Sequence, residues 1–166
     1  TRSASEWKLI DLDASVPIGT QLSDKNSQGY APPELAKELF VHKRRTPELL
    51  ARPSFDVWGF GVVLYELLTG TPLFLLDKSD DNLVSEYDKA ELINWIALDK
   101  DRLNRIRKDW KEGRNLVKRC LVGDPTKRIS MGEILEHPFF GDLQQRDSRV
   151  VGSSTKGITS SQPHRQ

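Results

Sequence analysis

A long apolar segment between Ser54 and Gly70 constrains the fold of this chain more than any other feature of its sequence. Apolar side chains, including Trp58 and Tyr65, occur on almost every side of a helix drawn over residues 55–68. A helix that is apolar all round is expected to be buried among other elements. Ser54 suits an N-cap, and Gly70 suits a C-terminal stop. The pattern therefore predicts a central, buried helix over residues 55–68.

Shorter helices are predicted before and after this segment. Residues 32–40 begin with two prolines and a glutamate, which suit a first helical turn. Residues 85–96 begin with a sequence that resembles a capping box, and residues 130–138 begin with a second one. Residues 116–121 carry a single apolar stripe of helical spacing. Only residues 7–10 have the composition of a strand, so the chain is predicted to be mainly α.

The C-terminal segment differs in composition from the rest of the chain. Among residues 144–166 the only large aliphatic side chains are Val150, Val151 and Ile158. Such a segment cannot bury enough apolar surface to offset its chain entropy. We therefore predict one domain over residues 1–143, followed by a disordered polar tail over residues 144–166.

Charge and cysteine content exclude several classes of function. The formal net charge of +1 gives no general attraction to nucleic acid or to an anionic membrane. The basic residues between 100 and 119 alternate with acidic ones, which favours a solvated helix face. Cys120 is the only cysteine, so an internal disulfide is excluded and a reducing, cytoplasmic location is expected. No apolar run is long enough to span a bilayer.

Five short motifs follow one another along the predicted domain. Taken singly, each has a plain structural explanation, such as a turn cap or a helix start. Together they resemble, in order, the C-terminal half of a protein kinase catalytic domain. They are Lys-Leu-Ile-Asp-Leu-Asp at residues 8–13, Ser-Gln-Gly-Tyr-Ala-Pro-Pro-Glu at 27–34, Asp-Val-Trp-Gly-Phe-Gly at 56–61, Asp-Pro-Thr-Lys-Arg at 124–128 and His-Pro-Phe-Phe at 137–140.

This resemblance implies a fold and an activity. The fold would be the helical C-lobe of the α+β protein kinase fold, truncated at its N-terminus. The activity would be transfer of the ATP γ-phosphate to Ser or Thr hydroxyls of a protein substrate, with Mg²⁺. The Gly-rich loop, the strand lysine and the His-Arg-Asp loop with the general base do not occur in this sequence, so they are expected upstream of Thr1. The isolated chain is therefore expected to be inactive, and a pseudokinase-like binding module remains the alternative.

The resemblance also implies roles at the expected nucleotide and substrate sites. Asp11 would hold Mg²⁺ against the ATP phosphates. Asp13 stands where the family usually has glycine, and this second carboxylate would either bind metal or restrict the turn. Ser27 and Tyr30 would lie in the loop that faces the protein substrate.

Other residues would have structural roles in the same family. Glu34 and Arg128 would form a buried ion pair that anchors the activation segment to the helical lobe. Asp56 would accept hydrogen bonds from the backbone of the catalytic loop, and Trp58 would pack beneath the activation segment.

The activation segment also contains candidate sites of regulation. Ser15, Thr20, Ser23 and Ser27 lie within it, and any of them could accept a regulatory phosphate. The sequence does not select among them. The basic run at residues 42–45 falls in a stretch that is longer than usual for the family. It could dock acidic partners, but a solvated insertion loop is favoured.

Overall fold

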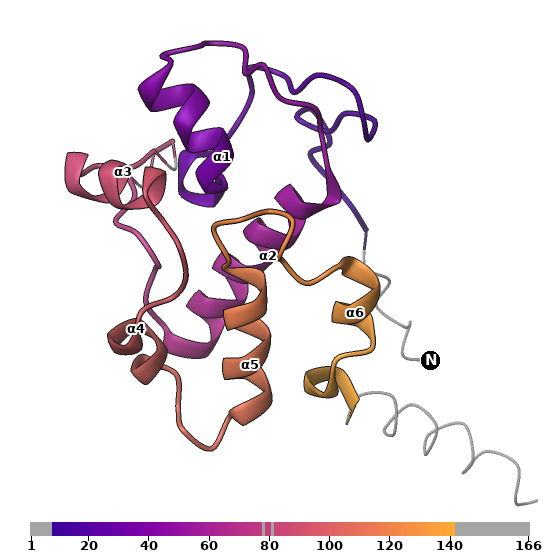
Figure 1. The fold of residues 1–166 in the computed structure, drawn as a ribbon, viewed down its shortest axis with the longest axis vertical. Helices are drawn as coiled ribbons and strands as arrows, with labels where there is room; N and C mark the ends of the chain where they lie inside the picture. Colours follow the sequence, from indigo (N-terminus) through magenta and orange to yellow (C-terminus); the bar gives the residue numbers. More distant parts are fainter. Residues whose placement is uncertain (1–7, 78, 81, 142–166) are drawn as a thin grey trace, which may run out of the picture.

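The computed structural model describes residues 8–77, 79–80 and 82–141, and these residues form a helical assembly (Figure 1). Within them, extended pairing is limited to two isolated antiparallel bridges, Gln21 with Leu50 and Leu76 with Leu83. The mainly α prediction is therefore confirmed. None of the described helices is long and apolar enough to cross a membrane. The predicted tail at residues 144–166 lies outside the described residues.

Helix α2 (Pro53–Thr69) runs through the middle of the described fold (Figure 1). It begins one residue before Ser54, with Arg52 as its N-cap, because proline is well suited to the first helical position. The helix stops at Gly70, whose backbone adopts the left-handed conformation with φ of 69°. The predicted C-terminal stop is thus confirmed, while the predicted cap at Ser54 is wrong.

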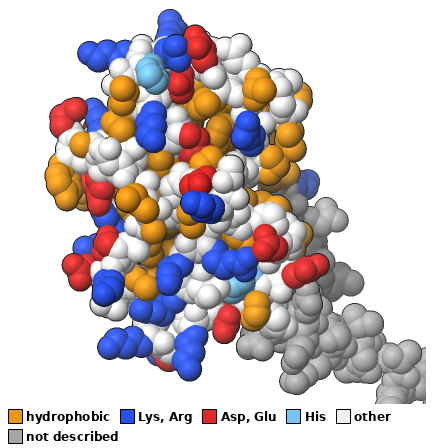
Figure 2. Space-filling model, viewed as in Figure 1, with side chains coloured by type: hydrophobic (Ala, Val, Ile, Leu, Met, Phe, Trp, Pro, Cys, Tyr) orange, Lys and Arg blue, Asp and Glu red, His pale blue; other side chains and the backbone are white. Residues whose placement is uncertain are grey.

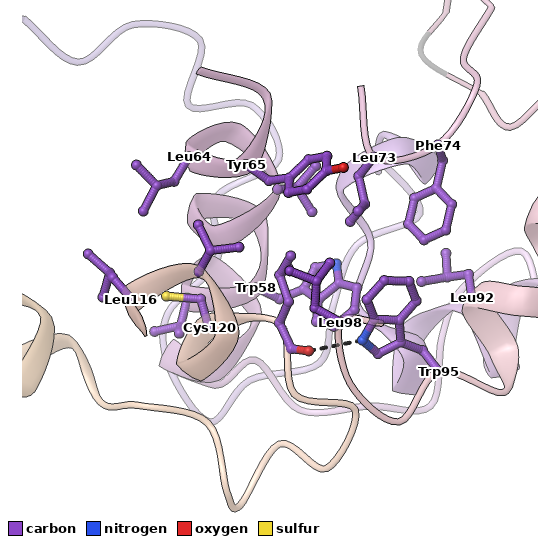
Figure 3. Close-up of a cluster of buried hydrophobic side chains, with 14 of the residues drawn as sticks. Trp58, Leu64, Tyr65, Leu73, Phe74, Leu92, Trp95, Leu98, Leu116 and Cys120 are labelled. Atoms are coloured by element: carbon purple, nitrogen blue, oxygen red, sulfur yellow. Dashed lines mark hydrogen bonds between the residues drawn. The ribbon is translucent and has the colours of Figure 1, made fainter. Parts of the chain in front are cut away.

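The core forms where α2 packs against α5 (Lys111–Cys120). The two helices approach closely at Gly61, where an added Cβ would lie only 2.6 Å from the Cβ of Cys120. Figure 3 shows the surrounding side chains, with Trp95 donating a hydrogen bond of 2.9 Å from its Nε1 to the carbonyl of Leu121. Burial raises the pKa of the Cys120 thiol to about 12, so this thiol stays protonated at neutral pH.

One side of α2 remains uncovered, and here the prediction of burial all round is wrong. Val63 is 44% exposed and Leu67 is 74% exposed. The apolar pattern correctly marks these positions as fit for burial. No described element packs over them, so their side chains face outward.

The segment that follows residue 32 is helical, as predicted. It forms α1 (Pro33–Ala36) and continues directly as a wider π-type turn, η2 (Lys37–Val41). Leu35 is buried between these elements and the rest of the fold, whereas Leu39 and Phe40 are half-buried.

Helix α3 (Glu86–Ile93) begins at Ser85, whose hydroxyl accepts hydrogen bonds from the backbone of Tyr87 and Asp88. It ends before Ile96, which the sequence pattern included in the helix. The chain turns after Ile93 so that Trp95 enters the core, and Ile96 is left 82% exposed. The remaining elements are η1 (Gln28–Tyr30), α4 (Lys100–Arg105), α6 (Met131–Leu135) and η3 (Pro138–Phe140).

Helix α6 has the capping box predicted for it. The Ser130 hydroxyl accepts a hydrogen bond from the backbone of Glu133, and the Glu133 carboxylate accepts one from the backbone of Ser130. Two of the free N–H groups at the helix start are thereby satisfied.

The predicted strand at residues 7–10 is wrong for the part that the structure describes. Residues 8–10 have no regular structure, and Leu9 and Ile10 are largely exposed. A strand needs a neighbour to pair with its backbone groups. No neighbouring strand is present among the described residues, so a β-prone composition is not sufficient here.

His137 is buried in the contact between α5 and the last turn. Its Nδ1 accepts a hydrogen bond of 3.1 Å from the backbone of Phe139, and its Nε2 lies 3.0 Å from the Oδ1 of Asn115. This pairing requires the neutral ring with the proton on Nε2. Burial lowers the pKa of His137 below its usual value, and the charge of Glu112 opposes that shift.

We expect the chain to lose stability as the pH falls below about 6.5, the ordinary pKa of histidine. The unfolded chain then binds a proton at His137 before the folded chain does, so acid favours unfolding. The stability that the neutral His137 ring contributes is fully present above that pH. The measurement is the free energy of unfolding in urea at pH 7.5 and at pH 5.5. His137→Gln should show a smaller difference between the two pH values, and an unchanged difference would contradict this assignment.

Candidate functional site

The turn at Asp11 has an unusual backbone. Asp11 adopts φ of 58°, in the left-handed region that non-glycine residues seldom enter. The turn is closed by a hydrogen bond of 3.0 Å from the backbone N–H of Ser15 to the carbonyl of Leu12. The Asp11 residue is exposed. Strained backbone of this kind is enriched at functional sites. Among the described non-glycine residues, Asp11 shares a positive φ with Lys43, whose φ is 50°.

Asp13 is tied to a residue that sequence reasoning did not select. Its carboxylate forms an ion pair with Lys25, and both side chains are more than half exposed. The hydrogen bond from Lys25 and the lysine charge lower the pKa of Asp13, and the same contact raises the pKa of Lys25. The pair joins the turn at Asp11 to the loop that follows it. No sequence signal marks Lys25, since nothing in the pattern relates positions 13 and 25.

Asp11 fits a role as one ligand of Mg²⁺, but not as part of a complete protein cage. No group of three or more acidic, histidine or cysteine side chains that could hold a metal occurs in the part of the chain that the structure describes. Mg²⁺ is commonly held by one or two carboxylates, with phosphate oxygens and waters as the other ligands. An exposed carboxylate such as that of Asp11 suits this mode, whereas the Asp13 carboxylate already has a cationic partner.

The loop between this turn and η1 is held against the residues that precede α2. The backbone N–H of Gly19 donates to the carbonyl of Ala51 at 2.9 Å, and that of Leu22 donates to Leu49 at 3.0 Å. Gly19 has φ of 83°, a conformation that glycine adopts without strain. These bonds give residues 14–31 a defined course over the N-terminal end of α2.

A cleft of about 510 Å³ lies between this loop and α2. Its walls are mostly apolar and include Phe60 and the exposed Val63, while Ser27, Tyr30 and Asp56 border it. The Asp56 carboxylate makes no hydrogen bond or ion pair with any described residue. An acceptor is therefore available beside an uncovered apolar surface.

The four candidate phosphorylation sites differ in their contacts. The Thr20 hydroxyl donates to the carbonyl of Pro17 at 2.7 Å, and the Ser23 hydroxyl accepts from the backbone of Lys25 at 3.3 Å. Ser15 and Ser27 are exposed, and their hydroxyls make no hydrogen bond within the described ranges.

Arg128 lies at the junction of α1, α2 and the loop before α6. Its side chain has no exposed surface, and its guanidinium group binds the Glu34 carboxylate through two hydrogen bonds, of 2.8 and 2.6 Å. The other donors reach the backbone carbonyls of Val122 at 2.7 Å, Ser54 at 3.0 Å and Gly123 at 3.1 Å. All five N–H groups of the guanidinium therefore have acceptors, and this planar geometry is specific to arginine.

Trp58 lies directly beneath this ion pair. The Arg128 guanidinium lies 5.1 Å from the centre of the Trp58 ring, which in turn packs edge-on against Trp95 at 5.6 Å (Figure 3). Cationic, aromatic and apolar contacts thus connect Glu34 to the core. The Trp58 Nε1 is buried without a hydrogen-bond partner among the described residues.

The basic run at residues 42–45 is largely paired with acidic residues of the same chain. Arg44 binds Glu38 at 2.8 Å and Glu48 at 3.1 Å, and Arg45 lies 3.5 Å from Asp24. The hydrogen bond from Arg44 lowers the pKa of the buried Glu38 carboxyl. The contacts favour an internally held loop over a free basic docking site.

The region between residues 100 and 119 is less solvated than its composition predicts. Arg102 is only 17% exposed, because it binds Glu91 and Asp99 and lies over the ring of Trp95. The prediction of a uniformly solvated helix face is therefore wrong at this position. Helical spacing alone did not reveal these partners.

Comparison with known proteins gives the family. A model of the protein kinase domain matches residues 2–140 of this chain. The chain belongs to the protein kinase family. It is 30% identical over 140 residues to the serine/threonine-protein kinase PKZ1 of Phytophthora infestans, a match that covers 82% of this chain and 31% of that protein.

Two rice proteins give similar matches. The serine/threonine protein kinase OSK3 of Oryza sativa subsp. indica is 35% identical over 114 residues, which cover 69% of this chain and 18% of that protein. The calcium-dependent protein kinase 21 of Oryza sativa subsp. japonica is 32% identical over 113 residues, which cover 66% of this chain and 19% of that protein. The chain thus spans about a third or less of the length of these relatives.

Proposed function

We propose that this chain forms the activation segment and helical lobe of a Ser/Thr protein kinase that transfers the ATP γ-phosphate to hydroxyl groups of a protein substrate. The observation that carries the proposal is the bidentate contact of Arg128 with Glu34. This contact holds the end of residues 27–34 beside the cleft that Asp56 borders. A segment fixed there can present a protein substrate to catalytic groups supplied from outside this chain.

The residues of this chain would prepare the site without completing it. Asp11 would provide a carboxylate ligand for Mg²⁺, which when bound neutralises charge on the transferred phosphoryl group. Asp56 would accept backbone hydrogen bonds from a catalytic loop seated in the cleft over α2. Ser27 and Tyr30 would contact the substrate. The general base and the phosphate-binding lysine would lie upstream, so the isolated chain would be inactive. The single cysteine, Cys120, is buried and unpaired, which suits a cytoplasmic location.

The test uses the protein expressed from its whole reading frame. We expect phosphate transfer from γ-labelled ATP and Mg²⁺ to a general protein substrate such as casein. Asp11→Asn should lower this rate on the order of 100-fold, because it removes a charged ligand at the site of transfer. Glu136→Gln serves as a control of equal charge change on an exposed residue and should leave the rate unchanged. Residues 1–166 alone should show no transfer.

A second candidate is a pseudokinase-like binding module, and the contact between Asp13 and Lys25 favours it. This pair adds a tethered carboxylate where the family usually has glycine, and it restrains the turn that carries Asp11. If the second candidate is right, the whole protein transfers no phosphate in the same assay. In that case, adding ATP and Mg²⁺ shifts the melting temperature of the Asp11→Asn variant by the same amount as that of the wild type.

A further inference from the structure

Residues 42–51 form most of the link between η2 and α2, and they contain the basic run that the sequence favours as a solvated loop. Figure 1 shows this segment crossing the upper end of the described fold and then descending beside the N-terminal loop to reach α2. Basic, acidic and histidine side chains gather at the same end in Figure 2. The proposed phosphoryl transfer assigns no role to this segment, so its contacts need a separate explanation.

One end of the 42–51 segment is held by Glu38, which lies in η2 and is only 9% exposed. Its Oε2 accepts a hydrogen bond of 2.8 Å from the Arg44 guanidinium and one of 3.1 Å from the backbone N–H of Glu48. Its Oε1 lies 3.8 Å from the Nε2 of His42. Within the described residues, every partner of this carboxylate therefore belongs to the 42–51 segment.

The other end of the segment pairs with the loop formed by residues 14–31. Besides the backbone bonds described above, the N–H of Ala51 donates to the carbonyl of Thr20 at 2.8 Å. The Gln21 side chain donates from its Nε2 to the carbonyl of the fully buried Pro47 at 3.3 Å. A two-stranded contact as short as this is not stable in water by itself. The course of loop 14–31 therefore depends on what holds the 42–51 segment in place.

Two charged contacts could hold these parts together, and they differ in strength. The contact of Glu38 with Arg44 is partly buried, and charge-assisted hydrogen bonds are roughly twice as strong as neutral ones. Separating a buried carboxylate from its partners is also costly. The ion pair of Arg45 with Asp24, at 3.5 Å, is largely exposed, and pairs of this kind contribute little. Glu38 is therefore the main support of the segment.

We propose that Glu38 is a positioning residue for the protein substrate. It holds the 42–51 segment, which pairs with residues 19–22 and so sets the course of loop 14–31. Glu38 is not among the residues that line the cleft over α2, so it acts on a substrate only through this loop. The proposal rests on the proposed function in one respect, which is that loop 14–31 receives the protein substrate.

The first test is hydrogen–deuterium exchange, followed by mass spectrometry, of the protein expressed from its whole reading frame. Glu38→Gln should accelerate exchange in peptides that span residues 19–22 and 49–51 about tenfold, because the charged contact with Arg44 is lost. Exchange in residues 116–121, at the end of α5, should stay unchanged. Equal acceleration there would mean that Glu38 supports the whole fold, and it would overturn the proposal. An unchanged rate at residues 19–22 would overturn it as well.

Glu48→Gln is the matched control for this measurement. The Glu48 carboxylate binds the same Arg44 at 3.1 Å but is 66% exposed, so its loss should leave exchange at residues 19–22 unchanged. Arg44→Lys keeps a cation beside Glu38, and its acceleration should be smaller than that of Glu38→Gln. A larger effect from Glu48→Gln than from Glu38→Gln would contradict the role assigned to Glu38.

The second test measures phosphate transfer to casein by the same variants. Glu38→Gln should raise the KM for casein several-fold and leave both kcat and the KM for ATP unchanged, because only the position of the loop is affected. An equal rise of the KM for ATP, or a fall in kcat alone, would overturn the proposal. If the whole protein transfers no phosphate, the proposed function fails, and the exchange rates alone decide whether Glu38 positions the loop.

Discussion

Replacing Arg128 with methionine is expected to lower the free energy of unfolding by about 3–5 kcal/mol, the usual cost of removing one partner from a buried ion pair. The change leaves the Glu34 carboxylate without its cation. It also removes the donors that satisfy the carbonyls of Val122, Ser54 and Gly123. Urea unfolding followed by tryptophan fluorescence measures the loss.

Arg119→Met is the matched control for this experiment. Arg119 lies 2.6 Å from Glu133, which equals the shorter of the two distances between Arg128 and Glu34. The side chains of Arg119 and Glu133, however, are both about half exposed. An exposed pair contributes about 0–1 kcal/mol. If Arg119→Met and Arg128→Met cost the same, burial is not the origin of the effect.

Two further variants separate charge from geometry at this position. Arg128→Lys keeps the positive charge but cannot reach five acceptors, so its stability should fall between those of the wild type and Arg128→Met. Glu34→Gln combined with Arg128→Met should cost less than the sum of the two single changes, because both remove the same contact. Full additivity would contradict a direct coupling.

The outcome for Glu34 and Arg128 illustrates what the sequence could predict. The two residues are 94 positions apart, and no local pattern joins them. Their proximity could be predicted because each belongs to a motif whose order along the chain resembles a known family. Local physics was sufficient elsewhere, as at the Gly70 stop and the Ser130 capping box, because these features depend on a few adjacent residues.

The features that could not be predicted depend on partners that the local sequence does not specify. The apolar composition of residues 8–10 indicated a strand, yet no strand is available among the described residues to pair with it. The pattern of α2 could show which side chains suit burial, but not that Val63 would remain uncovered. The position of Lys25 beside Asp13 emerged only from the three-dimensional arrangement.

The close approach of α2 and α5 gives the second large effect. We expect Gly61→Ala to destabilise the chain by about 1–3 kcal/mol, the range typical of overpacking in a dense core. The added Cβ would lie 2.6 Å from the Cβ of Cys120 and 3.0 Å from a methyl group of Leu121. Neither the short side chain of Cys120 nor the α5 backbone that carries it can move aside locally, so the two helices must separate. Alanine's higher helix propensity, about 1 kcal/mol over glycine, offsets only part of this cost.

Gly59→Ala, two residues earlier on the same helix, is the control. Its added Cβ would meet only the backbone oxygen of Tyr30, at an ordinary 3.8 Å. The gain in helix propensity should then dominate, and the free energy of unfolding should rise by up to about 1 kcal/mol. The two alanine variants are therefore expected to shift the urea midpoint in opposite directions. A shift in the same direction for both would mean that helix propensity, and not the contact between α2 and α5, decides the result at Gly61.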